Sequence, residues 1–183
     1  IATVYEDGNW SVAVTADDAI ALGEGDINIT AAQVDIAGNT SNSNAAKTLT
    51  VDTSVPSAPA VVLGTGVSDG ATDAEATASS GLATVAGESG ASIVTTLTGQ
   101  DGTVTKTLTG TGFAQAVVLT SMEVDELGEG SVSYSVRQTD AAGNAQTSDA
   151  VTGQFSIDTI IEAPTIDTIA TDDIANADEF TDG

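Results

Sequence analysis

Carboxylate side chains carry most of the chemistry that this sequence could perform. The motif D-x-A-G-N occurs at residues 35–39 and 140–144, and an Asp-Thr pair follows each copy, at residues 52–53 and 158–159. Proteins bind calcium through about six to eight oxygen ligands in irregular geometry. The motifs therefore indicate sites for a hard cation or, alternatively, turns in which Asp caps amides and Gly takes a positive φ. Neither motif has the spacing of an EF-hand loop.

The balance of charge favours the same kind of partner. The chain has 27 Asp and Glu residues against 3 Lys and Arg, which gives a formal net charge of −24. Lys47, Lys106 and Arg137 are far apart in the sequence, so no basic cluster is available for a phosphate backbone or an anionic membrane. Because the carboxylates repel one another on compaction, we expect divalent cations as the first partner. The lack of a basic cluster excludes nucleic acid as a partner.

Other kinds of chemistry find few suitable residues. The sequence has no His and no Cys, which removes the commonest general base, the usual zinc ligands and any disulfide. Neighbouring acids such as Asp17 with Asp18 would point to opposite faces of a strand, so nothing places them across a cleft. No apolar run reaches the roughly 18 residues of a membrane span. We expect a soluble, non-enzymatic segment whose export signal lies outside it.

A long internal repeat organises the chain. The run LGEG at residues 22–25 recurs at residues 127–130, and D-x-A-G-N recurs at the same shift of about 105 residues, close to the length of one sandwich domain. The phase predicts the C-terminal part of a repeat at 1–55, a complete repeat at 56–159 and the start of another at 160–183. Equivalents of residues 80–105 occur once, and we interpret the chain as an excerpt of a longer array.

The hydrophobic pattern predicts strands that would carry these motifs. Val132, Tyr134 and Val136 alternate with serines, and the apolar residues at 10–14 and 27–29 alternate in the same way. Aromatic residues make up only 3% of the chain, so Trp10 is expected in the core or at its rim. Residues 16–22 are the best helical candidate. The predicted fold class is all-β, with tandem immunoglobulin-like β-sandwich repeats of about 105 residues.

The order D-x-A-G-N, strand, Asp-Thr and then Ala-Pro resembles the bacterial Ig-like repeats of giant calcium-dependent surface adhesins. These adhesins include type I secreted, RTX-type and biofilm-associated proteins. The resemblance implies extracellular extender domains at the bacterial cell surface, stacked end to end and stiffened by calcium. It implies a role as a non-catalytic spacer whose partners are the neighbouring repeats, while other parts of the parent protein would bind a host-cell or surface ligand.

A short linker between sandwiches should bring three acidic elements to each junction: the D-x-A-G-N loop, the Asp-Thr pair and the acidic loop after the next unit's first strand. The first junction is predicted to gather Asp35, Asp52, Asp69 and Glu75 around Ca²⁺. The second is predicted to gather Asp140, Asp158, Asp173 and Glu179, joined by Asp172 or Asp178. Asp172 and Asp178 have no counterpart in the middle unit, so the two junctions need not bind the ion equally.

Two alternatives to a spacer remain open. A module that binds a glycan, a peptide or ice would need an exposed aromatic cluster or a flat array of Thr, and neither is visible in the sequence. A filament subunit could complete its partial ends by strand addition from another copy, although residues 80–105 occur only once. Glu24 and Glu129, in their glycine-flanked corners, are expected to be solvated turn residues.

Overall fold

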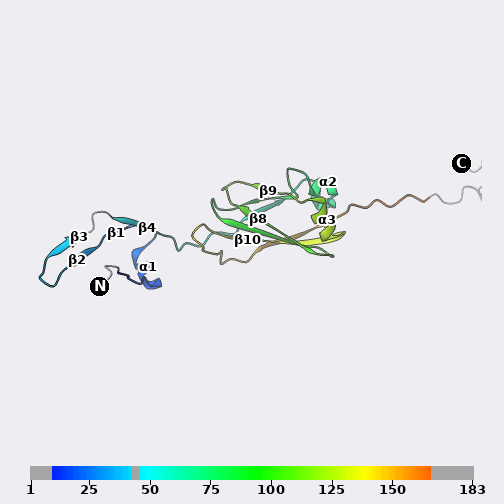
Figure 1. Cartoon of the computed structure of the whole chain (residues 1–183). Helices are drawn as coiled ribbons and strands as arrows, with labels where there is room; N and C mark the ends of the chain where they lie inside the picture. Colours follow the sequence, from blue (N-terminus) through cyan, green and yellow to red (C-terminus); the bar gives the residue numbers. More distant parts are fainter. Residues whose placement is uncertain (1–9, 43–45, 166–183) are drawn as a thin grey trace, which may run out of the picture.

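The protein is an all-β structure with short helices at the strand connections. The computed structural model describes residues 10–42 and 46–165 (Figure 1). The helical elements are α1 (Ala16–Leu22), the 3-10 turn η1 (Val67–Asp69), α2 (Asp73–Ala76) and α3 (Ser121–Leu127). The strands are β1 (Gly25–Ile29), β2 (Ala32–Val34), β3 (Thr40–Asn42), β4 (Lys47–Val51), β5 (Ala60–Leu63), β6 (Ala83–Ala86), β7 (Ser92–Thr98), β8 (Thr103–Thr109), β9 (Gln115–Val117), β10 (Gly130–Thr139) and β11 (Val151–Ile157).

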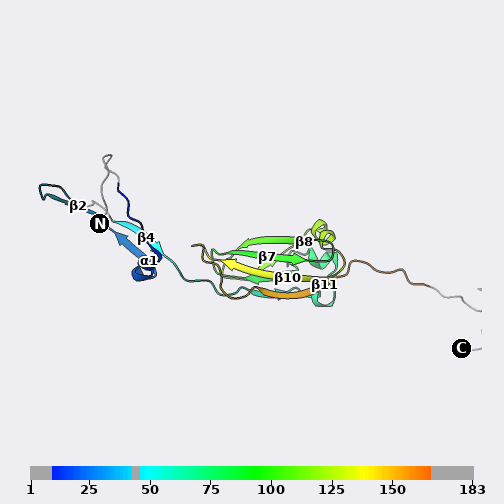
Figure 2. The same cartoon turned by 90° about the horizontal axis from the view of Figure 1, so that it is seen from below.

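Two antiparallel sheets form a sandwich between residues 60 and 157. One sheet has the strand order β11-β10-β7-β8 and the other has the order β5-β6-β9. Alternate residues of both sheets point inward, and Val85 and Val117 of the smaller sheet pack with Ile93 and Val136 of the larger one. A second core cluster includes Leu127 of α3, so this helix belongs to the sandwich. Figure 2 shows the larger sheet's strands side by side along the long axis.

The segment before the sandwich forms two smaller sheets, β1 with β4 and β2 with β3. By the repeat, β1 and β2 correspond to β10, and β4 corresponds to β11. Within residues 10–42 and 46–165, no sheet covers their apolar side chains: Leu22 is 46% exposed, whereas its repeat equivalent, Leu127, is 0% exposed. The strand predicted at residues 10–14 is wrong. The equivalent residues 115–117 form β9 by pairing with β6, and no described strand offers that pairing to residues 10–14.

Each α-helix starts with a Thr capping box, which explains how such short helices form. Thr15, Thr72 and Thr120 each accept a hydrogen bond from the amide three residues on, and that residue's carboxylate accepts one from the Thr amide. Two orphan amides of the first turn are thereby satisfied. The helix predicted at residues 16–22 is confirmed as α1. Gly23 and Gly128, with φ near +79° and +75°, follow α1 and α3.

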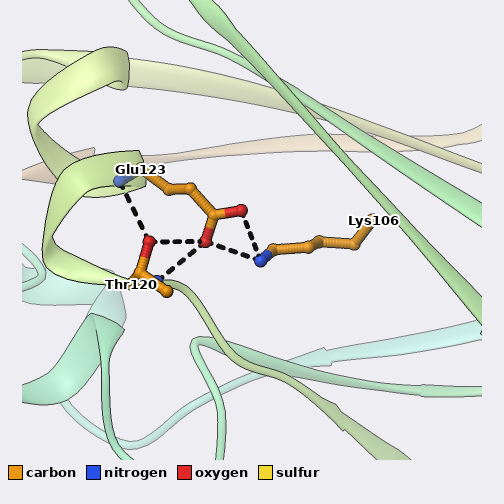
Figure 3. A network of polar contacts seen from close by, with 3 residues as sticks. All are labelled: Lys106, Thr120 and Glu123. Atoms are coloured by element: carbon orange, nitrogen blue, oxygen red, sulfur yellow. Dashed lines mark hydrogen bonds and ion pairs between the residues drawn. The ribbon is translucent and has the colours of Figure 1, made fainter.

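An ion pair attaches α3 to the edge strand β8. Lys106 Nζ lies 2.6 Å from Glu123 Oε2, the same oxygen that accepts from the Thr120 amide at 2.8 Å (Figure 3). The hydrogen bond from Lys106, followed by that of the Thr120 amide, lowers the pKa of Glu123. It is the only ion pair found among the described residues, and it joins the cap of α3 to β8.

The strands β5 to β11 lie inside the range predicted for the complete repeat, and the division into units at 1–55, 56–159 and 160–183 stays a prediction. Trp10 is 48% exposed, which places it outside the core. Within the described residues, no helix has the length and apolar character needed to cross a bilayer.

Candidate functional site

The antiparallel strands give the sandwich two different ends. We call the end with the β6–β7 turn and the β10–β11 loop the linker pole, because the chain enters there from residues 52–59. We call the opposite end the exit pole, because β11 finishes there at Ile157 beside the start of β10 at Gly130. Figure 1 shows the linker and the C-terminal segment leaving from opposite ends of the sandwich.

Both D-x-A-G-N loops are capped by their own Asp. Asp140 Oδ1 accepts from the amides of Ala142, Gly143 and Asn144 at 2.8 to 2.9 Å, and its Oδ2 accepts from Asn144 Nδ2 at 2.8 Å. Burial raises the pKa of Asp140, which is 7% exposed, but these hydrogen bonds outweigh burial and leave the pKa below its ordinary value. The carboxylate is therefore held as an anion by its own loop.

The loop of the N-terminal segment repeats this arrangement. Asp35 accepts from the Asn39 amide at 2.8 Å and from Asn39 Nδ2 at 2.7 Å. The side-chain hydrogen bond from Asn39, followed by that of its amide, lowers the pKa of Asp35. Gly38 and Gly143 have φ values of +91° and +102°, which a residue with a Cβ adopts only with strain. The turn predicted from the motif is present at both sites.

The β10–β11 loop contacts the linker that precedes its own unit. Asn144 Nδ2 donates to the Asp52 carbonyl oxygen at 3.1 Å, and Gln138 Nε2 donates to the Ser57 carbonyl oxygen. Asp140 and the first Asp-Thr pair therefore share the linker pole. Sequence reasoning placed Asp140 at the second junction, with Asp158, and that assignment is wrong.

The exit pole brings together the segment after β5 and the end of β11. Ala71 forms a parallel bridge with Ile157; its amide donates to the Ser156 carbonyl oxygen at 2.8 Å and its carbonyl accepts from the Asp158 amide at 3.0 Å. A Cβ added at Gly70 would lie 3.3 Å from the Cβ of Asp158. The loop that contains Asp69 thus lies beside the end of its own unit's last strand.

The predicted grouping of the acids into two junctions is therefore wrong, because strand direction places their loops at different poles. β5 runs from the linker pole to the exit pole, so the loop after it, with Asp69 and Glu75, lies at the exit pole of its own unit. β10 runs the opposite way, so the loop after it lies at the linker pole. Asp35, in the β2–β3 loop, belongs by the repeat to the equivalent of the linker pole, away from Asp52.

The described carboxylates do not form a ready cation site. Among residues 10–42 and 46–165, no group of three or more acidic side chains is placed to hold a metal ion. Asp52 Oδ1 accepts from the Ser54 amide at 3.2 Å, and Glu75 closes the cap of α2, where the Thr72 amide and then its hydroxyl lower the pKa of Glu75. Asp172, Asp173, Asp178 and Glu179 lie outside the described residues. Calcium stays a prediction.

Glu24 and Glu129 make contacts that sequence reasoning missed. Glu129 accepts hydrogen bonds from the amide and hydroxyl of Thr159, and Glu24 accepts the same two from Thr53. The side-chain hydrogen bond, followed by the backbone one, lowers the pKa of Glu24. Each Asp-Thr pair is thus fastened to the corner before its neighbouring strand. The sequence signal that could have indicated this contact is that LGEG and Asp-Thr recur together in both repeats.

The outer face of the larger sheet carries rows of hydroxyl groups. Thr105, Thr96, Ser135 and Thr152 occupy paired positions on β8, β7, β10 and β11, and they form one row across the sheet. The four strands contain no Asp or Glu, although the chain has 27 acids. The sequence alone did not reveal this face, because the rows depend on the pairing register.

Comparisons with known proteins add a likeness to solved structures. No family model matches the chain, and no curated protein matches it. A solved structure that it is similar to is described as the crystal structure of a tetra-tandem repeat in the extending region of a large adhesion protein. The two share 23% sequence identity with a TM-score of 0.41, over 86% of this chain and 37% of that chain.

Proposed function

We propose that this chain is a non-catalytic extender segment of a bacterial cell-surface adhesin, which spaces other parts of an extracellular protein. The observation that carries the proposal is the position of the two ends of the sandwich. The chain enters the sandwich at the linker pole and leaves it at the exit pole, so each added repeat lengthens the molecule along one direction (Figure 1). In such arrays, stability is a sum of terms for units and for nearest neighbours.

The repeated contact of the Asp-Thr pair supports this role. Glu24 holds Thr53 where the chain leaves β4, and Glu129 holds Thr159 where it leaves β11. A fixed exit direction is what a spacer needs, because bending at each exit would shorten the array. The same contact in two successive repeats indicates that the exit geometry belongs to the repeat unit.

We include calcium in the proposed function as the ion that stiffens the junctions. The support is the net charge of −24 and the acidic residues on both sides of a junction. Asp52 and Asp140 lie at the linker pole, while Asp69 and Asp158 lie at the exit pole of the same unit. Since consecutive units would bring an exit pole against a linker pole, a bound divalent cation would offset the repulsion between those two sets.

Scattering and calorimetry on the full chain test this function. Calcium is expected to lengthen the maximum dimension and raise the melting temperature, and ligand linkage gives about 2.7 kcal/mol at roughly 100 times the dissociation constant. Asp52→Ala should weaken both effects, whereas Asp101→Ala, in the β7–β8 turn away from the linker, should not. If chelation changes neither quantity, calcium does not act on this segment.

The hydroxyl face favours a second candidate function, the binding of a glycan. Rows of exposed and half-buried Thr and Ser without acids could hydrogen-bond to a neutral polysaccharide. Electrophoresis of the full chain through gels that contain dextran or β-glucan tests this function, because binding retards migration. Retardation that Thr105→Glu abolishes and Thr48→Glu leaves intact would support it, and equal mobility in all gels would eliminate it.

A further inference from the structure

Two side-chain amides of the sandwich reach the linker that precedes it. Asn144 Nδ2 lies 3.1 Å from the Asp52 carbonyl oxygen, and Gln138 Nε2 donates to the Ser57 carbonyl oxygen. These acceptors lie near the two ends of the linker, just after β4 and just before β5. The sandwich therefore holds the linker at two separated points, which restrains its direction as well as its position.

Gln138 is itself rigidly placed. Its side chain is in the core at 3% exposure, and its Oε1 accepts from the Glu88 amide in the β6–β7 turn at 3.0 Å. Its backbone amide donates to Gln146 Oε1 at 2.8 Å, and Gln146 Nε2 in turn donates to the Asp149 carbonyl oxygen at 3.0 Å. A buried amide whose oxygen and nitrogen are each hydrogen-bonded is held in one rotamer, so it transmits the position of the sandwich to Ser57.

Asn144 is fixed in a similar way by its loop. The same amide that reaches Asp52 also donates to Asp140 Oδ2 at 2.8 Å, while the Asn144 backbone amide donates to Asp140 Oδ1 at 2.8 Å. The capped loop thus orients the Asn144 side chain toward the linker. Its donor is neutral, so the contact needs no counterion and is little affected by salt.

The repeat provides the matched comparison. Gln33 and Asn39 are the equivalents of Gln138 and Asn144, and both are exposed. Asn39 donates to Asp35 Oδ2 at 2.7 Å, so it keeps the capping role, but among the described residues it reaches no linker carbonyl. Capping of the loop therefore does not require the linker contact.

We propose that Gln138 and Asn144 form a linker clamp, which fixes the orientation of the sandwich relative to the preceding segment without a cation. The inference deepens the proposed extender function and rests on it, because a spacer has to resist bending at this linker. It assigns the stiffness of the junction to neutral amide donors. Cation binding would then add to a joint that is already restrained.

Distances between spin labels on the full chain test the clamp, and the absence of native Cys makes the labelling selective. Labels on Cys introduced at Thr48 and Thr105, which are exposed on β4 and β8, span the linker. In chelator, the parent chain should give a narrow distance distribution. Asn144→Ala and Gln138→Ala should each broaden it by about twofold or more, since a released linker samples many directions.

The equivalent variants Asn39→Ala and Gln33→Ala should leave the distribution unchanged, because they alter only the preceding segment. Asn144→Ala keeps the experiment decisive if Gln138→Ala fails to fold. A broad distribution for the parent chain in chelator would overturn the clamp, and so would equal broadening by Asn39→Ala and Asn144→Ala. If the distance distribution of the parent chain is broad in chelator but narrows with calcium, the clamp fails while the calcium-stiffened extender stands. If the distribution is narrow in chelator and calcium leaves it unchanged, the clamp stands and stiffening by calcium fails.

Discussion

At the scale of single residues, the polar groups with the largest expected effect on stability are those buried in the sandwich. Asp140 is buried and satisfied by its own loop, whereas Thr95, on the inner face of β7, has a buried hydroxyl without a partner among the described residues. Burial has opposite consequences in the two cases, because a polar group is stabilising in the interior only when it is paired. Each case gives a prediction.

Thr95→Val should stabilise the sandwich. Valine has nearly the same shape as threonine and suits a strand. Thr95 is 3% exposed and its hydroxyl has no hydrogen-bond partner among the described residues, so the substitution removes an unpaired buried group. We expect the free energy of unfolding to rise by about 1 kcal/mol, the lower end of the cost of an unsatisfied buried group. Urea denaturation measures it, with Thr107→Val on the exposed face of β8 as the control. A destabilised Thr95→Val would mean that its hydroxyl is satisfied by water.

Asp140 should make the protein sensitive to acid. Because its pKa is lowered in the folded state from the ordinary 3.8, its contribution is present above that value and is lost as the pH falls through the folded pKa. Asp140→Asn should lower the melting temperature at neutral pH and flatten its decline below about pH 4. Thermal melts between neutral pH and acid measure both. Asp149→Asn, in the same loop, is the comparison variant; a parent slope in Asp140→Asn would contradict the prediction.

At the scale of elements, the short helix α3 is attached to the edge strand β8 through its cap. α3 has 7 residues, which is too few for stability in isolation, and it is kept by Leu127 in the core and by the contact of Glu123 with Lys106. The carboxylate that completes the cap also receives the ion pair from β8. A change at the cap should therefore act on the packing of the whole helix.

Thr120→Ala should destabilise the sandwich by about 1 kcal/mol, because the first turn of α3 loses the acceptor for the Glu123 amide. Urea denaturation of the full chain measures this change. Thr15→Ala removes the corresponding cap of α1, which has no buried residue, and serves as the matched control. The prediction is contradicted if the two variants shift the unfolding of the sandwich equally.

At the scale of the whole molecule, the described residues form a sandwich and a preceding segment whose apolar side chains are more exposed. Phe155 is 7% exposed, while its repeat equivalent Leu49 is 40% exposed. The difference arises because β4 has no opposing sheet among the described residues. The sandwich, by contrast, holds its core clusters between residues 67 and 157.

Residues 56–159 should fold alone. They include β5 to β11 and both core clusters, so removal of the other residues takes away few apolar contacts. Circular dichroism should show a β-sheet spectrum with cooperative melting within a few degrees of the sandwich transition in the full chain. A helical or unordered spectrum would contradict the prediction and would mean that the flanking segments are needed for folding.

The sequence by itself determined the features that depend on near neighbours. Alternating Val132, Tyr134 and Val136 predicted a half-buried strand, residues 16–22 predicted the helix α1, and D-x-A-G-N predicted a turn. These predictions succeeded because alternation, capping and positive φ are set within a few residues. The strand predicted at residues 10–14 failed because a strand also needs a partner, which local pattern does not provide.

Only the tertiary structure decided which loops lie together. Strand direction placed the loop of Asp140 beside Asp52 and the loop of Asp69 beside Asp158, so the acids expected at one junction lie at different poles. Pairing register aligned the hydroxyl rows, and the antiparallel pairing of β10 with β11 brought Glu129 to Thr159, 30 residues on. The physical reason is that contacts between distant residues depend on the direction and register of every strand between them.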